Sequence, residues 1–224
     1  MKTLIFGDIH GRDFWKEAAK NVDKFDKVIF LGDFHDPYPG QVSKDKSRHM
    51  LRDELVPFIE ENIDKVICIK GNHDLNYLFP TPMANRFDNF HKEEIYRLLR
   101  RLPFTLAYQI DDYLFSHAGI IKGWLEFNDK SIRDVLDDTI SFDELSQVSE
   151  YRGGYDRYSS CVWCDLQEFI WSRKPEGYYQ IFGHTQLQDQ PIMAKEFACL
   201  DCRKAFMLDT EKKTLREYDE KFID

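Results

Sequence analysis

Three short blocks, each led by glycine, follow apolar runs in the first third of the chain. They read GDIHG from Gly7, GDFHD from Gly32 and GNHD from Gly71. The residues before each block, such as VIFL at 28–31, form the short apolar run that is typical of a buried strand. Each block therefore predicts a strand that ends in a tight turn, with Asp, His or Asn side chains at its carboxyl end.

Two later runs end in the same way, in FSHAG at 115–119 and IFGHT at 181–185. In open α/β sheets, ligands bind outside the carboxyl ends of the strands. A single Gly-Asp or Gly-His pair would carry little weight. Five strand ends in series, with carboxylate, imidazole and amide groups, predict a metal centre because divalent metals accept these ligands.

Size and charge set further limits. A chain of 224 residues with 42% hydrophobic content can bury one core, which predicts a single domain over 1–224. The net charge of −9 argues against broad nucleic-acid binding. No apolar run approaches the ~18 residues of a membrane span. The first block begins at Gly7, which leaves no room for a signal peptide, so we expect a cytoplasmic protein.

In the first half, strand-like and helix-like runs alternate, which predicts βαβ units and a largely parallel sheet. Asp13 is the expected cap of a helix that runs to about residue 20. A second helix is expected over about 47–63, with a kink or restart at Pro57. A third helix is expected to end before Pro103.

The second half predicts short strands with turns between them, and hence a second, more antiparallel sheet packed on the first. A hairpin is expected around Asp111-Asp112. The expected strands lie at 105–110, 113–116, 178–182, 197–200, 205–208 and 214–218. The segment 141–160 is polar and rich in tyrosine, and we expect it to be a loop that lines the site.

Two CxxC pairs, at 161–164 and 199–202, leave a structural zinc site open as an alternative. However, 34 residues separate the pairs, far more than in a compact zinc ribbon. Alternation along a strand would also send Cys199 and Cys202 to opposite faces. We favour buried, reduced thiols.

The blocks provide ligands for two metal ions. Asp8 and His10 lie two residues apart on an extended segment, so both can face one ion, and Asp33 is placed to bridge to a second. The remaining ligands of the second ion would be Asn72, His117 and His184. Two ions about 3.5–4 Å apart can activate a shared water and hold the oxygens of a phosphoryl group.

His73 follows Asn72 and would project beside the metals instead of onto them. It suits the role of general acid to the leaving oxygen. Asp36 would hold the imidazole in the right tautomer and orientation. His35 is an undecided neighbour of the site. The other two histidines lie in helical segments and are expected at the surface, namely His49 and His91.

At these residues the sequence resembles the calcineurin-like metallophosphoesterases, and within them the small bacterial and phage serine/threonine phosphoprotein phosphatases. The matching positions, in order, are Asp8-x-His10, Asp33, Asn72-His73, His117 and His184. The resemblance implies an α/β (α+β) fold of two packed mixed β-sheets flanked by helices. It also implies two divalent metal ions at the strand ends. Mn²⁺ is the expected ion, and Fe²⁺ or Zn²⁺ would also suit the ligands.

Some positions depart from the family pattern. Many members end their last motif with a second histidine, but this chain has Gln186 at that position. In lacking the second histidine, the chain resembles the phosphoprotein phosphatase branch. That branch reads GDxxDRG, whose arginine clamps the phosphate, but here Pro37 stands at that position. The resemblance implies that Arg152 binds phosphate. Arg86 could also cover the loss, and Arg12 is a weaker candidate.

The leading hypothesis is a metal-dependent phosphomonoesterase that uses a metal-bridging hydroxide on phosphoproteins, small phosphomonoesters or nucleotides. The alternative is a phosphodiesterase or (di)nucleotide hydrolase. Pro37 motivates it, together with tyrosines that could stack on a base. These are Tyr38, Tyr151, Tyr155 and Tyr158. A remote alternative is a non-catalytic metal-binding scaffold.

Overall fold

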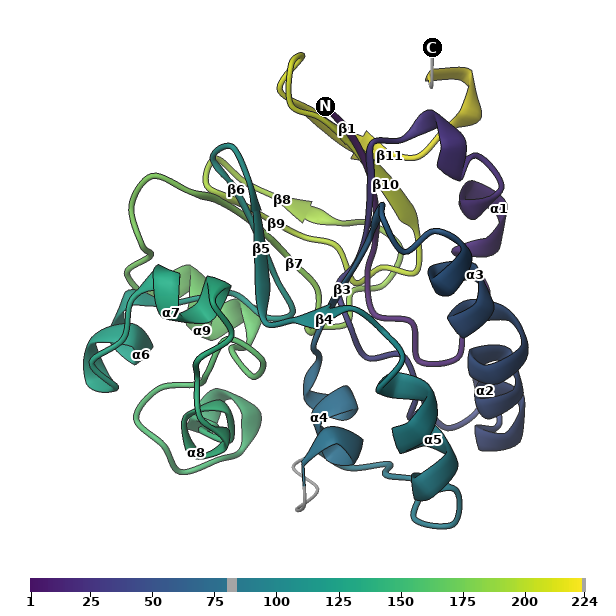
Figure 1. Cartoon of the computed structure of the whole chain (residues 1–224). Coiled ribbons are helices and arrows are strands. Elements are labelled where there is room, and N and C mark those ends of the chain that lie inside the picture. Colours follow the sequence, from purple (N-terminus) through teal and green to yellow (C-terminus); the bar gives the residue numbers. More distant parts are fainter. Residues whose placement is uncertain (80–83, 223–224) are drawn as a thin grey trace.

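The apolar strands that precede the glycine-led blocks lie side by side in one sheet. The computed structural model describes residues 1–79 and 84–222 (Figure 1). Four parallel strands run in sequence order across the sheet. They are β1 (Lys2–Phe6), β2 (Lys27–Phe30), β3 (Val66–Ile69) and β4 (Phe104–Thr105). Two C-terminal strands complete this sheet beyond β1, in the order β11-β10-β1.

The second sheet has the strand order β5-β6-β7-β9-β8. Its strands are β5 (Ala107–Ile110), β6 (Tyr113–Ser116), β7 (Tyr179–Phe182), β8 (Ile192–Met193) and β9 (Phe197–Cys199). The hairpin between β5 and β6 at residues 111–112 is confirmed. The sheet is mixed, as the expected fold class requires: β5–β6 and β8–β9 pair antiparallel, whereas β6, β7 and β9 run parallel to one another.

The last two strands of the chain belong to a different sheet than expected. β10 (Ala205–Asp209) and β11 (Thr214–Glu217) belong to the first sheet, not the second. β10 pairs antiparallel with β1, from Lys2 opposite Asp209 to Phe6 opposite Ala205. Local sequence cannot show this because the pairing joins the two ends of the chain.

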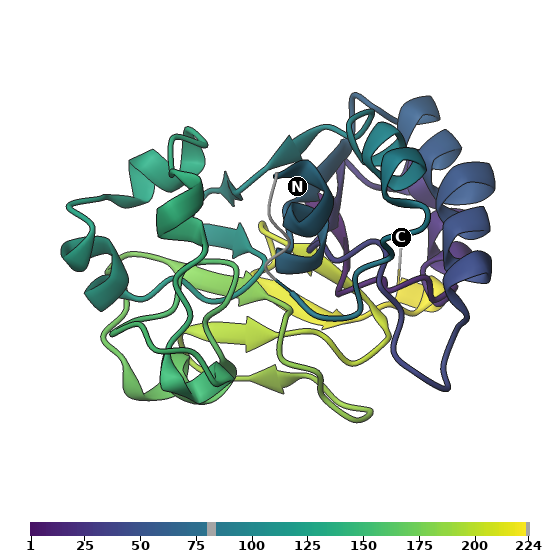
Figure 2. The ribbon, with the colours of Figure 1, turned by 90° about the horizontal axis from the view of Figure 1, so that it is seen from below.

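Helices cover the outer side of each sheet. In Figure 1, α1, α2, α3 and α5 lie along one side and α6, α7 and α9 along the other, and Figure 2 shows the same separation from below. The helices are α1 (Lys16–Ala19), α2 (Lys44–Met50), α3 (Val56–Glu61), α4 (Asn72–Leu78), α5 (Lys92–Leu99), α6 (Lys122–Phe127), α7 (Ile132–Leu136), α8 (Phe142–Leu145) and α9 (Leu166–Trp171). Short 3-10 turns lie at Val22–Lys24, Glu150–Arg152 and Glu220–Phe222. Among the described residues, no helix has the length and apolar character to cross a bilayer.

Alternation along the strands explains the layers. Phe6 and Phe30 point toward the helices, whereas Ile5 and Ile29 point into the core between the two sheets. A strand with both faces covered must be apolar throughout, which is why these runs do not alternate with polar residues. The expected fold class of two mixed sheets flanked by helices is therefore confirmed.

Two helix boundaries differ in detail from expectation. α1 begins after Trp15, without a side-chain cap, so the assignment of Asp13 as its cap is wrong. The second helix runs from α2 through a π-helical segment at Leu51–Leu55 into α3, with Pro57 in the first turn of α3. Because proline cannot donate a backbone hydrogen bond, the expected kink or restart at this residue is confirmed as a change of helix type.

Both CxxC pairs are buried and unpaired. Cys199 packs with the core under α6, α7 and α9, whereas Cys202 lies in the core between the sheets, as alternation predicts. Among the described residues, no group that could hold a metal includes a cysteine. The zinc alternative therefore has no support from the structure.

Phe30 provides a test of the core. It is fully buried, and its ring centroid lies 4.8 Å from that of Phe6 and 5.7 Å from that of Phe34. Phe30→Ala should lower the free energy of unfolding by about 3–5 kcal/mol, because it removes packed surface and leaves a cavity. Urea unfolding followed by circular dichroism measures this. Phe90→Ala is the control, because Phe90 is 95% exposed, and an equal loss in both variants would contradict the assignment.

Candidate metal centre

The strand ends bring the expected ligands together. Asp8 follows β1, Asp33 follows β2 and Asn72 begins α4 just after β3. His117 follows β6 and His184 follows β7, so the second sheet contributes from the facing side. All five side chains are buried. The site therefore lies where the carboxyl ends of both sheets meet.

The carboxylate of Asp33 occupies the middle of the cluster. Its Oδ2 lies 3.4 Å from Nε2 of His10 and 3.6 Å from Nε2 of His117. Its Oδ1 accepts a hydrogen bond from the backbone N–H of His73 at 2.9 Å. Burial alone would raise the pKa of Asp33, but the neighbouring histidines, led by His117, outweigh burial and lower that pKa to about 2. Asp33 is therefore an anion at neutral pH.

Two histidines direct their Nε2 atoms into the cluster. The Nδ1 of His10 lies 2.8 Å from the carbonyl oxygen of His35, and the Nδ1 of His117 lies 2.7 Å from that of Leu31. A carbonyl oxygen only accepts, so each Nδ1 carries a proton and each Nε2 faces the cluster. Burial holds the pKa of His10 well below its usual value, which keeps this ring in the neutral form that binds metal. Burial lowers the pKa of His117 as well, but Asp33 and Asp8 outweigh burial and raise that pKa above its usual value.

A second group of acceptors meets at His117. Its Nε2 lies 3.0 Å from Oδ1 of Asn72 and 3.1 Å from Nδ1 of His184. Burial also keeps the pKa of His184 well below its usual value. Lone pairs held this close repel one another unless a proton or a cation lies between them. A divalent cation would satisfy all of them at once.

A buried carboxylate oxygen without a hydrogen-bond partner supports a metal site here. Oδ2 of Asp8 is buried and has no hydrogen-bond partner among the described residues, although Oδ1 accepts from the backbone N–H of His184 at 3.0 Å. Two groups of side chains have ligand atoms within 4.8 Å of one another. They are Asp8, Asp33 and His117, and His10, Asp33 and His73. The residues present therefore fit a divalent metal centre.

The glycines of the blocks make room for these carboxylates. A Cβ on Gly71 would lie 2.1 Å from Oδ1 of Asp33, and a Cβ on Gly183 would lie 2.2 Å from Oδ1 of Asp8. Contacts this short are impossible for real atoms. Each of these glycines is thus required by the aspartate of another block.

The backbone at the site is strained. His10, Asp33, Asp36 and His184 have φ angles of 44°, 51°, 56° and 63°. Non-glycine residues seldom adopt positive φ, and such strain gathers at functional sites where the surrounding structure enforces it.

His73 and Asp36 form the expected pair. The Nδ1 of His73 lies 2.9 Å from Oδ2 of Asp36, so the ring donates from Nδ1 and directs Nε2 away from the carboxylate. Asp36 is fully buried and also accepts from the side chains of Asn76 at 3.0 Å and of Tyr77. Sequence reasoning missed Asn76 and Tyr77, although their spacing from His73 puts them on the same face of α4.

Asp74 was missed as well. Its carboxylate accepts from the backbone N–H groups of Asp33 and Gly71 at 2.8 Å and of Phe34 at 2.9 Å. It therefore fixes the turn after β2 against the turn after β3. The available signal was its place as the last residue of the GNHD block.

Two arginines beside the candidate ligands, Arg12 and Arg152, have carboxylate partners. The Nε of Arg152 lies 3.1 Å from Asp165 Oδ2, and its Nη2 donates to the carbonyl of His184 at 2.9 Å. The Nη2 of Arg12 donates to the carbonyl of Asp8 at 2.6 Å and lies 3.4 Å from Asp201 Oδ1. Both residues thus lie beside the site, each with a carboxylate partner.

The remaining histidines divide as follows. His49 is exposed, and His91 is half-buried with its Nδ1 3.0 Å from Asp88 Oδ2. His35 is buried, its Nδ1 is 2.7 Å from the hydroxyl of Ser47, and its carbonyl orients His10 as described above. His35 therefore supports a candidate ligand through its main chain.

Comparisons with known proteins fit this geometry. A family model described as calcineurin-like phosphoesterase matches residues 1–188. A cold-active protein-tyrosine phosphatase from a psychrophilic Shewanella species has a similar structure, with a TM-score of 0.54, 13% identity, and coverage of 97% of this chain and 80% of that one. A protein serine/threonine phosphatase from Saccharomyces cerevisiae gives a TM-score of 0.53, 11% identity and coverage of 98% and 80%. At these identities the structures share the fold. A comparison with curated proteins finds no match.

His35 predicts how the stability of the metal-free protein depends on pH. Burial lowers its pKa from 6.5 to about 4, although Asp36 and Asp88 oppose this. The unfolded chain therefore gains the proton first as the pH falls, and stability is lost between pH 6.5 and 4. From pH 7 to 5, the metal-free wild type should lose about 2 kcal/mol more than His35→Gln.

Urea unfolding after chelation, at several pH values, measures this difference. His49→Gln is the control, because it removes a histidine whose side chain is exposed. Identical pH dependence in the wild type and His35→Gln would show that His35 does not contribute.

Proposed function

Because the chain belongs to the calcineurin-like phosphoesterase family, we propose that it is a metal-dependent phosphomonoesterase with two divalent metal ions. The observation that carries this proposal is the carboxylate oxygen of Asp33, which lies 3.4 and 3.6 Å from the Nε2 atoms of two histidines. A single oxygen between two ligand groups is what a bridging ligand requires. The first ion would take Asp8, His10 and Asp33, and the second Asp33, Asn72, His117 and His184.

The ions, when bound, supply an activated water and neutralise charge on the phosphoryl oxygens. The protein contributes the acid. His73 is held by Asp36 through Nδ1, so its Nε2 is the atom that gives a proton to the leaving oxygen. Tyr77 and Asn76 hold Asp36 in turn, which fixes the ring in one orientation.

The substrate is proposed to be a phosphorylated protein, a small phosphomonoester or a nucleotide. The segment 141–160 contains α8 and a 3-10 turn, and it brings Arg152 against His184 at the edge of the cluster. Arg152 could bind phosphate there by exchanging Asp165 for the substrate. We propose Mn²⁺ as the native metal. The five unpaired cysteines support a reducing, cytoplasmic compartment.

Hydrolysis of p-nitrophenyl phosphate tests the function. The wild type should be stimulated by Mn²⁺, and Asp33→Asn should reduce kcat to background because it removes the bridging anion. His73→Ala should lower kcat by about 10²–10⁴-fold, the usual contribution of a general acid. His49→Ala should retain wild-type activity, because this side chain is exposed. Unchanged rates in both site variants would refute the mechanism.

A phosphodiesterase or (di)nucleotide hydrolase is the second candidate. Tyr38 favours it, because its ring lies 4.9 Å from that of His10 and could stack on a base. Tyr151 and Tyr155 are exposed, and Tyr158 packs near Phe127. Rates on mono- and bis-p-nitrophenyl phosphate with the same metal separate the two functions. We expect the monoester to react much faster, and the reverse order would favour the diesterase.

A further inference from the structure

Four side chains form a closed ring of contacts beside the candidate metal ligands. The ring of His10 lies 4.9 Å from the ring of Tyr38 and 5.1 Å from that of His73. The guanidinium of Arg86 lies 3.8 Å from the centre of the Tyr38 ring, and its Nη2 lies 3.0 Å from Nε2 of His73. Arg86 therefore contacts the proposed general acid, His73, directly. It also packs on Tyr38, which in turn contacts the candidate metal ligand His10.

The segment 84–88, which carries Arg86, is held to α4 by hydrogen bonds at both of its ends. The amide of Asn76 accepts from the backbone N–H of Ala84 at 2.7 Å and donates to its carbonyl at 3.3 Å. The hydroxyl of Tyr77 accepts from the backbone N–H of Asp88 at 2.9 Å. Asn76 and Tyr77 are the same two residues that hold Asp36. One pair of side chains on α4 thus positions both the acid pair and the arginine segment.

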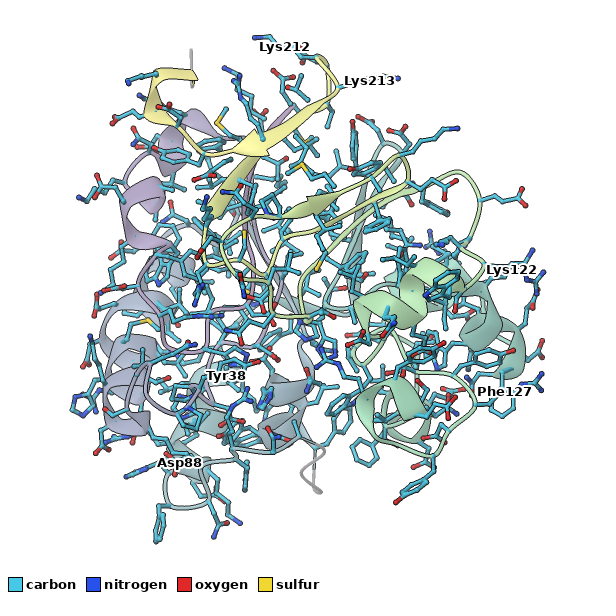
Figure 3. The ribbon with its side chains drawn as sticks, turned by 180° about the vertical axis from the view of Figure 1, so that it is seen from behind. Tyr38, Asp88, Lys122, Phe127, Lys212 and Lys213 are labelled. Carbon is cyan, nitrogen blue, oxygen red and sulfur yellow. The ribbon has the colours of Figure 1, made fainter. Side chains whose placement is uncertain are left out.

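Arg86 itself is oriented by four contacts, one of which runs from its Nη1 to Oδ1 of the neighbouring Asn85 at 3.3 Å. Its Nε donates to the carbonyl of Asp36 at 3.0 Å, its flat face covers Tyr38, and its Nη2 points at His73. Its φ angle of 63° falls in the same left-handed region as those of the ligand turns. Figure 3 labels Tyr38, over which the guanidinium lies, in the lower half of the view. A flexible surface arginine would not be held in this way.

The charge of Arg86 is also unbalanced. Arg12 pairs with Asp201 and Arg152 pairs with Asp165, but within residues 1–79 and 84–222 Arg86 has no carboxylate within ion-pair distance. It is half-buried, so water screens the guanidinium only in part. A fixed cation of this kind, next to a site proposed to hold metals, lacks an anion.

We propose that Arg86 binds the phosphoryl group of the substrate, on a stack with Tyr38. This proposal rests on the proposed function. Each Nη atom carries two protons, so Nη2 can contact His73 and still donate to an oxygen, and Nη1 can donate to Asn85 and still provide a second donor. Such a fork grips two phosphoryl oxygens at once. It favours a phosphomonoester, whose terminal group has more charged oxygens than a diester.

The test compares Arg86→Gln and Arg86→Lys with Arg100→Gln. Arg100 is a matched control, because its guanidinium lies 5.6 Å from the ring centre of Tyr96 and it is exposed just after α5. With Mn²⁺ present, Arg86→Gln should weaken inorganic phosphate binding about 10- to 100-fold in calorimetry and raise KM for p-nitrophenyl phosphate similarly. Arg86→Lys should fall between, because it keeps the charge and loses the fork. Arg100→Gln should match the wild type.

Tyr38 is a positioning residue in this arrangement, and it is tested separately. Tyr38→Phe keeps the ring and should keep the phosphate affinity, whereas Tyr38→Leu should weaken it because the stack is lost. Equal losses in both Tyr38 variants would show that the hydroxyl, not the stack, matters, and would overturn this part of the proposal.

The outcomes separate this proposal from the proposed function. If the wild type hydrolyses the ester but Arg86→Gln binds phosphate as tightly as Arg100→Gln does, the assignment of Arg86 is wrong and the function stands. If no ester is hydrolysed but phosphate binding depends on Arg86, the anion site stands and the function is wrong. If Arg86→Gln weakens Mn²⁺ binding as strongly as phosphate binding, the effect passes through the metals and overturns the assignment.

Discussion

The carboxylate of Asp33 is the contact on which the rest of the site depends. One oxygen lies between two histidines that come from different sheets, and the other accepts from the backbone of His73. The main chain of Asp33 is held by Asp74, and the carboxylate fits only because residue 71 has no Cβ. The two sheets therefore cannot shift relative to each other without breaking this set of contacts. The contacts that fix the geometry of the site therefore also fix the position of one sheet relative to the other.

The helix α4 extends this constraint to the acid and the anion site. It is only seven residues long, yet it carries Asn72, His73, Asp74, Asn76 and Tyr77 in the site or in direct support of it. Its amino end meets the candidate metal ligands, and its next turn holds Asp36 and the segment around residue 86. A short helix has little stability of its own. Its position is therefore set by the turns on which it packs, which links the proposed acid His73 to Asp33.

The sequence predicted what depends on local pattern. Apolar runs that end in Gly-Asp or Gly-His predicted the strands and the turns, and the order of those turns predicted which candidate ligands come together. It did not predict that β10 pairs with β1, because that contact joins residues at opposite ends of the chain. Nor did it find Asp74, Asn76 and Tyr77 as supports of the site. Their roles appear only when the turns lie against one another, since each accepts or donates a hydrogen bond across two elements.

Strain and electrostatics together indicate what the site is built to bind. Turns with positive φ at His10, Asp33, Asp36 and His184 cost free energy, and so does the close approach of acceptor lone pairs around His117. A bound cation would offset both free-energy costs, because it would attract the acceptor atoms that otherwise repel one another and would hold the turns that present them. Metal binding and folding should then be coupled. Arg86 has the same left-handed backbone conformation, but its side chain is positively charged and so would attract an anion instead of a metal ion. The proposed site for the phosphoryl group requires such a charge beside the metal ligands.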